Sequence, residues 1–373
     1  MTASTISAAA LALLTAMSAP AAAGPAHGAP LSAAEPATRC TFSDPRLQET
    51  SGLAETSTGF VAINDSNFEP SKIRIFFLNR SCKIVRSVGY PTAARDPEDL
   101  AIDQNGRVWV ADIGDNVTAD TRRETIALWR LDPAEAKPTI FRLRYPDGPH
   151  DAEALVVTAD GVPVIITKEL QGPAGVYAPS EELIPNDDKG VALTRVGQFT
   201  PQATGTSNPY GASGNNLVTG AAFAPDARHV VIRTYSDAYE FLAPNGDIVK
   251  AITTGTPTIT PLPDEPQGEA IAYARDGKNF LTVSDAAEPT PLLAYAIAPR
   301  PDPTGPAVAD PENAAGSGGL TWLWVTIAAV TGVLGLGALV AGLVGVRRAR
   351  RGADDAERRE SVVPTSPAVR SRR

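Results

Sequence analysis

The sequence predicts an all-β protein, a β-propeller of about five blades, with six blades as the alternative. First, one nine-residue pattern occurs five times, opening with a hydroxyl or carboxylate residue and ending at a turn. Second, an apolar strand follows every turn, so each copy predicts a β-hairpin. Third, the copies begin 47, 55, 66 and 50 residues apart, and repeats of about 40–50 residues are typical of blades. The copies are SGLAETSTG from Ser51, EDLAIDQNG from Glu98, EALVVTADG from Glu153, TGAAFAPDA from Thr219 and EAIAYARDG from Glu269.

The two ends of the sequence indicate export and anchoring. Residues 1–23 carry no charged side chain and end in an A-x-A arrangement, which predicts a signal peptide rather than an uncleaved tail. Residues 320–346 are uncharged and precede RRARR, which predicts a transmembrane helix with a cytoplasmic C-terminus rather than a buried core helix. We therefore expect a single-pass protein in the cell membrane, with its N-terminal domain outside. The expected segments are a signal peptide (1–23), a disordered leader (24–37), the propeller (38–298), a Pro/Gly-rich linker (299–319), the helix (320–346) and a basic disordered tail (347–373).

The last repeat predicts how the ring closes. About 30 residues follow Glu269 before the Pro-rich segment at Pro299, which is room for three strands rather than four. We expect the missing strand from residues 38–43, because closure removes the unpaired edges of an open sheet. Cys40 on that strand and Cys82 are the only cysteines. In an exported chain they most simply form one disulfide, which would pin the closure.

Charge narrows the class of partner. The chain has 33 Lys and Arg against 42 Asp and Glu, a net charge of −9. The basic tail holds nine Arg and four acids, which leaves −14 for the rest of the chain. Such an acidic domain argues against nucleic acid and against anionic lipid surfaces, and it tolerates cations.

Blade geometry predicts where the polar side chains gather. The start of a first strand and the end of a second strand lie at the same mouth of the channel. The loop DIGDN, residues 112–116, leaves the second blade at this rim and adds Asp115 and Asn116. The residues that open the first strands are Ser51, Glu98, Glu153, Thr219 and Glu269, and those that end the second strands are Asp65, Asp112, Lys168, Arg233 and Asp285.

Three of the residues that open strands are glutamates, and they repel one another unless something compensates. A cation such as Ca²⁺ suits oxygen ligands; alternatively Lys168 and Arg233 form ion pairs, or one glutamate is protonated because its neighbours raise its pKa. The structural alternative is that the acids accept backbone hydrogen bonds and hold blades together. The candidate metal ligands are Glu98, Glu153, Glu269 and Asp112; the candidate ligand-binding residues are Asp65, Asp115, Asn116, Lys168, Arg233 and Asp285.

Several motifs resemble a known group of proteins. SGLAE, DPEDLAI, VWVADIGDN, TIALWRL and HDAEALVV together are similar to exported bacterial propellers of the phytase-like (esterase-like) families, of the wider kind that includes SMP-30 and NHL-type propellers. The similarity spans most of residues 40–300. It implies carboxylates that hold Ca²⁺ at a channel mouth, with Glu98, Glu153 and Glu269 as the matching positions and Asp112 next.

The sequence departs from the enzymes of that group. It has only seven Lys and no G-x-S-x-G motif, so neither a polyphosphate site nor a serine esterase is supported. His150, beside Asp151 and Glu153, is the one candidate general base, and a plain loop histidine is the alternative. We expect a binding module that presents the acidic mouth to a small-molecule or protein ligand, with a calcium-dependent phytase-like or esterase-like hydrolase as the second hypothesis. A structural role is the third.

Overall fold

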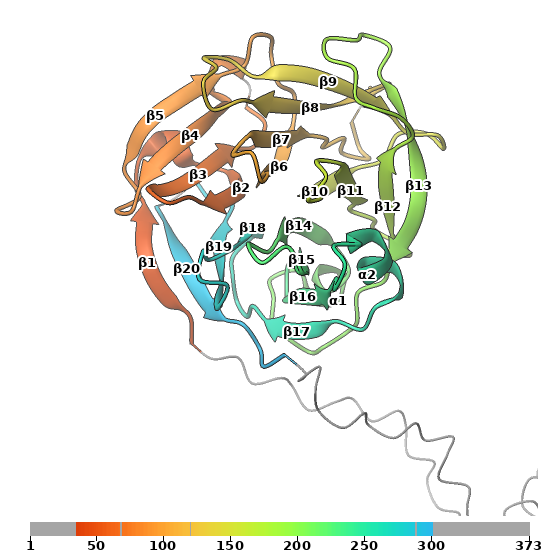
Figure 1. Cartoon of the computed structure of the whole chain (residues 1–373). Helices are drawn as coiled ribbons and strands as arrows, with labels where there is room; N and C mark the ends of the chain where they lie inside the picture. Colours follow the sequence, from red (N-terminus) through yellow and green to blue (C-terminus); the bar gives the residue numbers. More distant parts are fainter. Residues whose placement is uncertain (1–34, 68, 120, 288, 301–373) are drawn as a thin grey trace, which may run out of the picture. The chain divides into compact units, whose positions relative to one another are not determined.

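The computed structural model describes residues 35–300 except 68, 120 and 288. These residues form an all-β propeller of twenty strands, as the sequence predicts. The strands fall into five groups of four, although two of the groups join edge to edge as one eight-stranded sheet through β13 and β9. Figure 1 shows the groups around a common centre, with the first strand of each group innermost.

The strand bounds follow the five repeats. The first group is β2 (Thr50–Glu55), β3 (Gly59–Asn64), β4 (Arg74–Asn79) and β5 (Ile84–Gly89). The second is β6 (Pro97–Ile102), β7 (Val108–Asp112), β8 (Ile126–Leu131) and β9 (Thr139–Arg144). The third is β10 (Ala152–Val157), β11 (Pro163–Thr167), β12 (Ala174–Pro179) and β13 (Val191–Phe199). The fourth is β14 (Val218–Phe223), β15 (His229–Thr234), β16 (Asp237–Leu242) and β17 (Thr258–Pro261). The fifth is β18 (Gly268–Tyr273), β19 (Asn279–Ser284), β20 (Thr290–Ala296) and β1 (Ala37–Phe42).

The core lies between neighbouring groups. Each of five hydrophobic clusters combines side chains of two successive groups, and one of them joins the fifth group to the first. The inner strand β10 is buried at every position, because a strand between two packed faces exposes neither. The small and apolar residues of this strand therefore pack on both of its sides.

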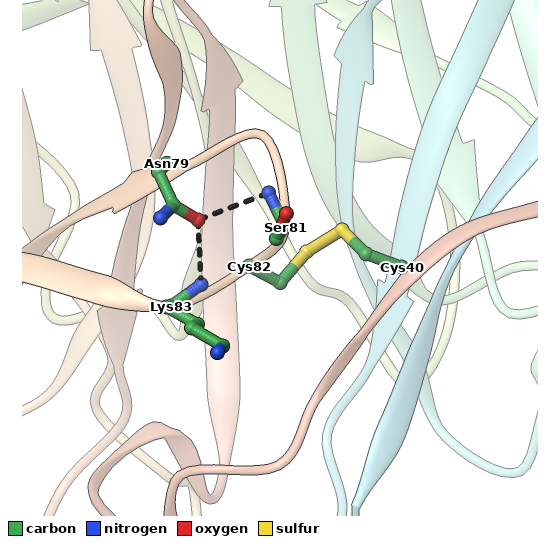
Figure 2. Close-up of a disulfide and its surroundings, with 5 residues drawn as sticks. All are labelled: Cys40, Asn79, Ser81, Cys82 and Lys83. Carbon is green, nitrogen blue, oxygen red and sulfur yellow. Dashed lines mark hydrogen bonds between the residues drawn. A yellow bond between two sulfur atoms is a disulfide. The ribbon is translucent and has the colours of Figure 1, made fainter.

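The closing strand and the disulfide are confirmed. Strand β1 pairs with β20, from Ala37 opposite Ala294 to Phe42 opposite Thr290. Cys40 on β1 forms a disulfide with Cys82, which lies in the turn between β4 and β5. Figure 2 shows the bridge beside the turn, where Asn79 Oδ1 accepts hydrogen bonds from the backbone N–H groups of Ser81 and Lys83. The first and last strands of the propeller are thus tied to the first group.

A repeated irregularity marks the inner strands. In every group the pairing between the first and second strand skips one residue of the first strand. A β-bulge of this kind leaves the extra residue unpaired and redirects its side chain. The five skipped residues are Ser51, Glu98, Glu153, Thr219 and Glu269, the residues that open the five sequence repeats.

The predicted localisation at the cell membrane is contradicted. Within the part of the chain that the structure describes, no helix has the length and apolar character needed to cross a membrane. Its two α-helices are α1 (Gly211–Gly214) and α2 (Ile248–Thr254). The predicted signal peptide (1–23), transmembrane helix (320–346) and tail (347–373) lie outside the described residues, as does nearly all of the leader and linker.

Candidate functional site

The five bulge residues have two different roles: two bond to the neighbouring blade, and three place carboxylates at the channel mouth. The Ser51 hydroxyl donates a 2.8 Å hydrogen bond to the carbonyl of Pro97, and the Thr219 hydroxyl donates a 2.8 Å bond to that of Gly268. Each hydroxyl therefore fastens its own blade to the next. The other three bulge residues are glutamates that are only 5–7% exposed. They bring carboxylates together at one mouth of the channel.

One half of this mouth is a compact group of acids. Asp65 follows β3, Asp96 precedes β6, and Glu98 is the bulge residue of β6; one carboxylate oxygen of each lies within 4.8 Å of the others. A Cβ atom on Gly114 would lie 2.1 Å from Glu98 Oε1 and 2.5 Å from Asp96 Oδ2. The absence of a side chain at Gly114 therefore makes room for these two carboxylates.

The other half is a chain of hydrogen bonds. The Lys168 ammonium donates to Glu153 Oε1 over 2.8 Å and to the Tyr235 hydroxyl over 2.9 Å. That hydroxyl in turn donates to Glu269 Oε1 over 2.8 Å. The second oxygen, Glu269 Oε2, is buried and has no hydrogen-bond partner among the described residues. Gln267 donates to both Glu269 and Asp285 and completes this half.

We call the six carboxylates Asp65, Asp96, Glu98, Glu153, Glu269 and Asp285, with Lys168, the acidic mouth. Burial, reinforced by the Asp96 charge, raises the pKa of Asp65 to about 8. Burial and the Glu269 charge raise the pKa of Asp285 to about 6. Burial and then the Glu153 and Asp65 charges raise the pKa of Glu98 well above its usual range. One lysine is too little positive charge for six ionised carboxylates, so without a cation the mouth retains protons.

Lys168 is held as a cation. Its burial lowers the pKa of the ammonium, but the Glu153 and Glu269 carboxylates outweigh burial and raise it. The predicted ion pair with a bulge glutamate is therefore present. The predicted ion pair between Arg233 and a bulge glutamate is not present. Arg233 is fully buried, and it donates to Glu265 over 3.0 Å and to the carbonyl of Ala270 over 2.8 Å. Arg233 thus holds the fourth and fifth groups together.

Asp112 differs from the other candidate metal ligands because both of its carboxylate oxygens already accept hydrogen bonds. Its two oxygens accept from the backbone N–H groups of Arg95 and Asp96, from Arg123 and from Trp129 Nε1, at 2.8–3.1 Å. Four donors occupy the lone pairs that a metal would need. These bonds fit the alternative in which the acid accepts hydrogen bonds and holds blades together better than they fit the predicted metal role. Asp112 also positions Asp96, because it accepts a hydrogen bond from the Asp96 backbone N–H.

The rest of the DIGDN loop is likewise held by its own contacts. The side chain of Asp115 is fully buried and accepts from Arg122 Nε over 2.8 Å and from the backbone N–H of Arg123 over 3.0 Å. Asn116 Oδ1 accepts from the N–H and the hydroxyl of Thr118. Both predicted ligand-binding residues therefore shape the loop rather than face the acidic mouth.

His150 lies in a different environment from the one that a general base needs. Its Nδ1 lies 3.1 Å from Glu169 Oε1, and its Nε2 lies 3.1 Å from Asp147 Oδ1 and from the Tyr177 hydroxyl. Both ring nitrogens are therefore occupied by neighbouring side chains. The contacts of His150 give no support to the catalytic role considered from the sequence.

Sequence reasoning missed two kinds of residue. Asp99 is fully buried and accepts from the N–H groups of Leu155 and Ala221, at 2.8 and 3.1 Å, so it ties three inner strands together. Tyr210 and Tyr235 stack at 4.3 Å between ring centroids beside Glu269. The only signal for Tyr235 was its place two residues after Arg233, at the end of a second strand.

Comparisons with known proteins add similarity of fold alone. The chain matches no known family and no curated protein. It is similar to a solved gluconolactonase from Xanthomonas campestris, at 12% identity over 66% of this chain and 72% of that one, with a TM-score of 0.38. It is also similar to the aldose sugar dehydrogenase of Escherichia coli, at 12% identity over 71% of this chain and 99% of that one, with a TM-score of 0.38. A streptogramin B lyase is similar at 10% identity over 68% of this chain and 96% of that one, with a TM-score of 0.38. At such low values nothing about chemistry is drawn from them.

Proposed function

We propose that the protein is a cation-dependent binding module, in which the acidic mouth holds a divalent cation and presents it to a ligand. The observation that carries this proposal is the convergence of Asp65, Asp96 and Glu98 within 4.8 Å. In the other half of the acidic mouth, Glu269 Oε2 has no described partner. Hard cations such as Ca²⁺ take six to eight oxygen ligands from carboxylates, carbonyls and water. The residues present fit that chemistry.

The charge balance supports the same proposal. Burial raises the pKa values of Asp65, Asp96 and Glu98, and neighbouring carboxylates reinforce the shift at Asp65 and Glu98. Bound calcium would favour the ionised form of these three carboxylates. The Lys168 ammonium has three N–H donors, and among the described residues Glu153 and Tyr235 accept from two of them. One donor is therefore left for a ligand. A small-molecule or protein ligand with oxygen acceptors would suit the cation and Lys168, whereas an anionic nucleic acid is disfavoured by the net charge.

A thermal melt of the full-length protein tests this proposal. We expect Ca²⁺ to raise the melting temperature relative to EDTA, because a ligand that binds the folded state stabilises it by mass action. In Glu98→Gln the rise should be lost. The melting temperature in EDTA should increase, because a neutral amide spares the folded state the proton uptake that burial imposes on Glu98. The exposed Glu182→Gln is the control and should behave as the wild type. No shift with Ca²⁺, Mg²⁺, Mn²⁺ or Zn²⁺ would reject the proposal.

A metal-dependent hydrolase is the second candidate, and Glu269 is the observation that favours it. A bound cation lowers the pKa of water, and the unpartnered Glu269 Oε2 is an acceptor for the released proton. Turnover of carboxylic or phosphate esters that depends on Ca²⁺ and is lost in Glu269→Gln would support hydrolysis. Calcium binding without turnover would leave the binding module alone.

We also infer that the ring has five blades. The support is the five four-stranded groups, the five inner bulges and the five clusters between successive groups. The inner strands contact in the order β2, β6, β10, β14, β18 and again β2. This order of contacts among the described residues supports five blades rather than the alternative of six.

A further inference from the structure

A second cavity lies beside the DIGDN loop. It has a volume of about 400 Å³ and is lined by Arg122, Arg123 and Arg144, together with Tyr145 and His150. We call it the arginine groove. A cavity of this size accommodates a small ligand, and none of the contacts described for the acidic mouth uses it. Its lining also includes two carboxylates, Asp115, which pairs with Arg122, and the exposed Glu124, so its three arginines outnumber its acids.

Each guanidinium group of the groove retains an unused donor. Arg122 donates through Nε and one terminal nitrogen, to Asp115 and to the carbonyl of Pro149. Arg123 donates through Nε and one terminal nitrogen as well. Arg144 donates only through Nε, to backbone carbonyls. The described residues thus leave one terminal nitrogen of Arg122 and of Arg123, and both of Arg144, without an acceptor.

Two of these groups are fixed in place before any ligand arrives. Asp115, whose side chain is fully buried, holds Arg122, and Asp112 holds Arg123, whose side chain is 7% exposed. Arg144 has no carboxylate within ion-pair distance among the described residues and donates only to backbone carbonyls. Preorganised guanidinium groups with free terminal nitrogens match the two oxygens of a carboxylate or phosphate.

Tyr145 provides an independent indication. Its hydroxyl is buried and has no hydrogen-bond partner among the described residues, which is costly for a donor in a folded protein. The ring packs edge-on against His150 and Tyr177, with both centroid distances at 4.9 Å. A shift of the ring toward the groove would let a ligand oxygen accept a hydrogen bond from the hydroxyl.

We propose that the arginine groove binds a small oxyanion, a carboxylate or phosphate group, through the free nitrogens of Arg122, Arg123 and Arg144 and the Tyr145 hydroxyl. The proposal goes beyond cation binding at the acidic mouth and does not depend on it. Arg144 and Tyr145 set affinity, because they alone among these residues have no side-chain acceptor of their own in the described chain.

Calorimetric titration of the full-length protein tests the proposal, with inorganic phosphate, sulfate and acetate as separate probes. The protein is first stripped of cations with EDTA and then dialysed into chelator-free buffer, so that neither a cation at the acidic mouth nor the carboxylates of EDTA contribute. Chloride keeps the ionic strength constant. We expect saturable binding of at least one probe. Arg144→Gln and Tyr145→Phe should each weaken it by about tenfold, the effect of one hydrogen bond to a charged group. Preference for phosphate over acetate identifies a tetrahedral oxyanion, and the reverse a carboxylate.

Matched variants separate ligand contact from a structural effect. Tyr90 also has a buried hydroxyl without a described partner, but it packs on Trp129 outside the groove. Tyr90→Phe and the exposed Arg195→Gln should retain wild-type affinity. Tyr145→Phe should lose affinity without a lower melting temperature, since it removes only an unpaired hydroxyl. No saturable binding of any probe, or undiminished affinity in Arg144→Gln and Tyr145→Phe, would overturn the proposal.

Discussion

At the scale of single residues, Asp112 and Glu98 show how hydrogen bonds distinguish a structural carboxylate from a candidate metal ligand. They lie on the paired strands β6 and β7, where Pro97 is opposite Asp112. Asp112 accepts four hydrogen bonds, whereas no described residue donates one to the Glu98 carboxylate. Two buried acids a few ångströms apart along the same hairpin therefore have different capacities to bind a cation.

Replacing Asp112 by Ala should destabilise the protein strongly. The change leaves the buried Arg123 without its carboxylate partner and Trp129 Nε1 without an acceptor, and breaking a buried pair costs about 3–5 kcal/mol. Urea unfolding measures the change in the free energy of unfolding. The control is Asp132→Ala, which breaks a more exposed pair with Arg130 and should cost about 1 kcal/mol or less. Equal stability of the two variants would contradict this account of Asp112.

The stability of the metal-free protein should fall as the pH rises. The pKa of Asp65 is about 8 in the folded state but about 3.9 in an unfolded chain. The folded state therefore keeps a proton that the unfolded state releases, so this contribution is complete below about pH 4 and is lost as the pH rises through about 8. Asp285, with a pKa of about 6, acts in the same direction at lower pH.

Thermal melts in EDTA between about pH 5 and pH 8 measure this loss. Asp65→Asn should flatten the upper part of the profile, because an amide does not titrate. Saturating Ca²⁺ should reverse the slope, since the cation favours the ionised carboxylates. A wild-type melting temperature in EDTA that is constant, or that rises with pH, would contradict the assignment.

At the scale of elements, the bulges of the five inner strands and the DIGDN loop shape the acidic mouth together. Each bulge turns one residue out of the pairing pattern, and three of the five are glutamates. The loop contributes Gly114, against which Glu98 and Asp96 pack. The loop therefore acts through its glycine and its arginine contacts, although its acidic residues first drew attention.

Gly114→Ala should weaken calcium binding by about tenfold or more, because the added Cβ would lie 2.1 Å from Glu98 Oε1 and small misplacements of ligands are costly at a preorganised site. Calcium titration calorimetry measures the affinity. Gly89→Ala is the matched control, since its Cβ would meet only the flexible end of Arg74 at 3.1 Å. Wild-type calcium affinity in Gly114→Ala would show that these carboxylates do not hold the cation.

The sequence predicted the fold well because the fold depends on local patterns. The repeats, the turns after each first strand and the three-strand remainder after Glu269 were enough to predict the closing strand and the disulfide, both confirmed. The site was less accessible, because its chemistry depends on which oxygens already have donors. Asp112 meets Arg123 and Trp129, and Arg233 meets Glu265, through side-chain contacts that no repeat specifies. The bulges themselves are invisible in a pattern of residue types.

At the scale of the whole molecule, the ring is closed by β1 and pinned by the bridge from Cys40 to Cys82, 42 residues apart. The double variant Cys40→Ser/Cys82→Ser should lose roughly 2–5 kcal/mol of unfolding free energy. Chemical denaturation measures this loss. Reduction of the wild-type protein should reproduce it, and an unchanged unfolding curve after reduction would show that the β1–β20 pairing alone secures the ring.

The pairing of β1 with β20 also orders events in time. Ala37 lies opposite Ala294, so the strand that leaves the ribosome first finds its place only after the strand that leaves last. Contacts so distant along the chain form slowly, because a long loop must close before they contribute. During synthesis β1 would wait with unpaired edges, which invite pairing with another chain. The pairing of β1 with β20 therefore covers an edge that is exposed in the nascent protein, as well as completing the mature ring.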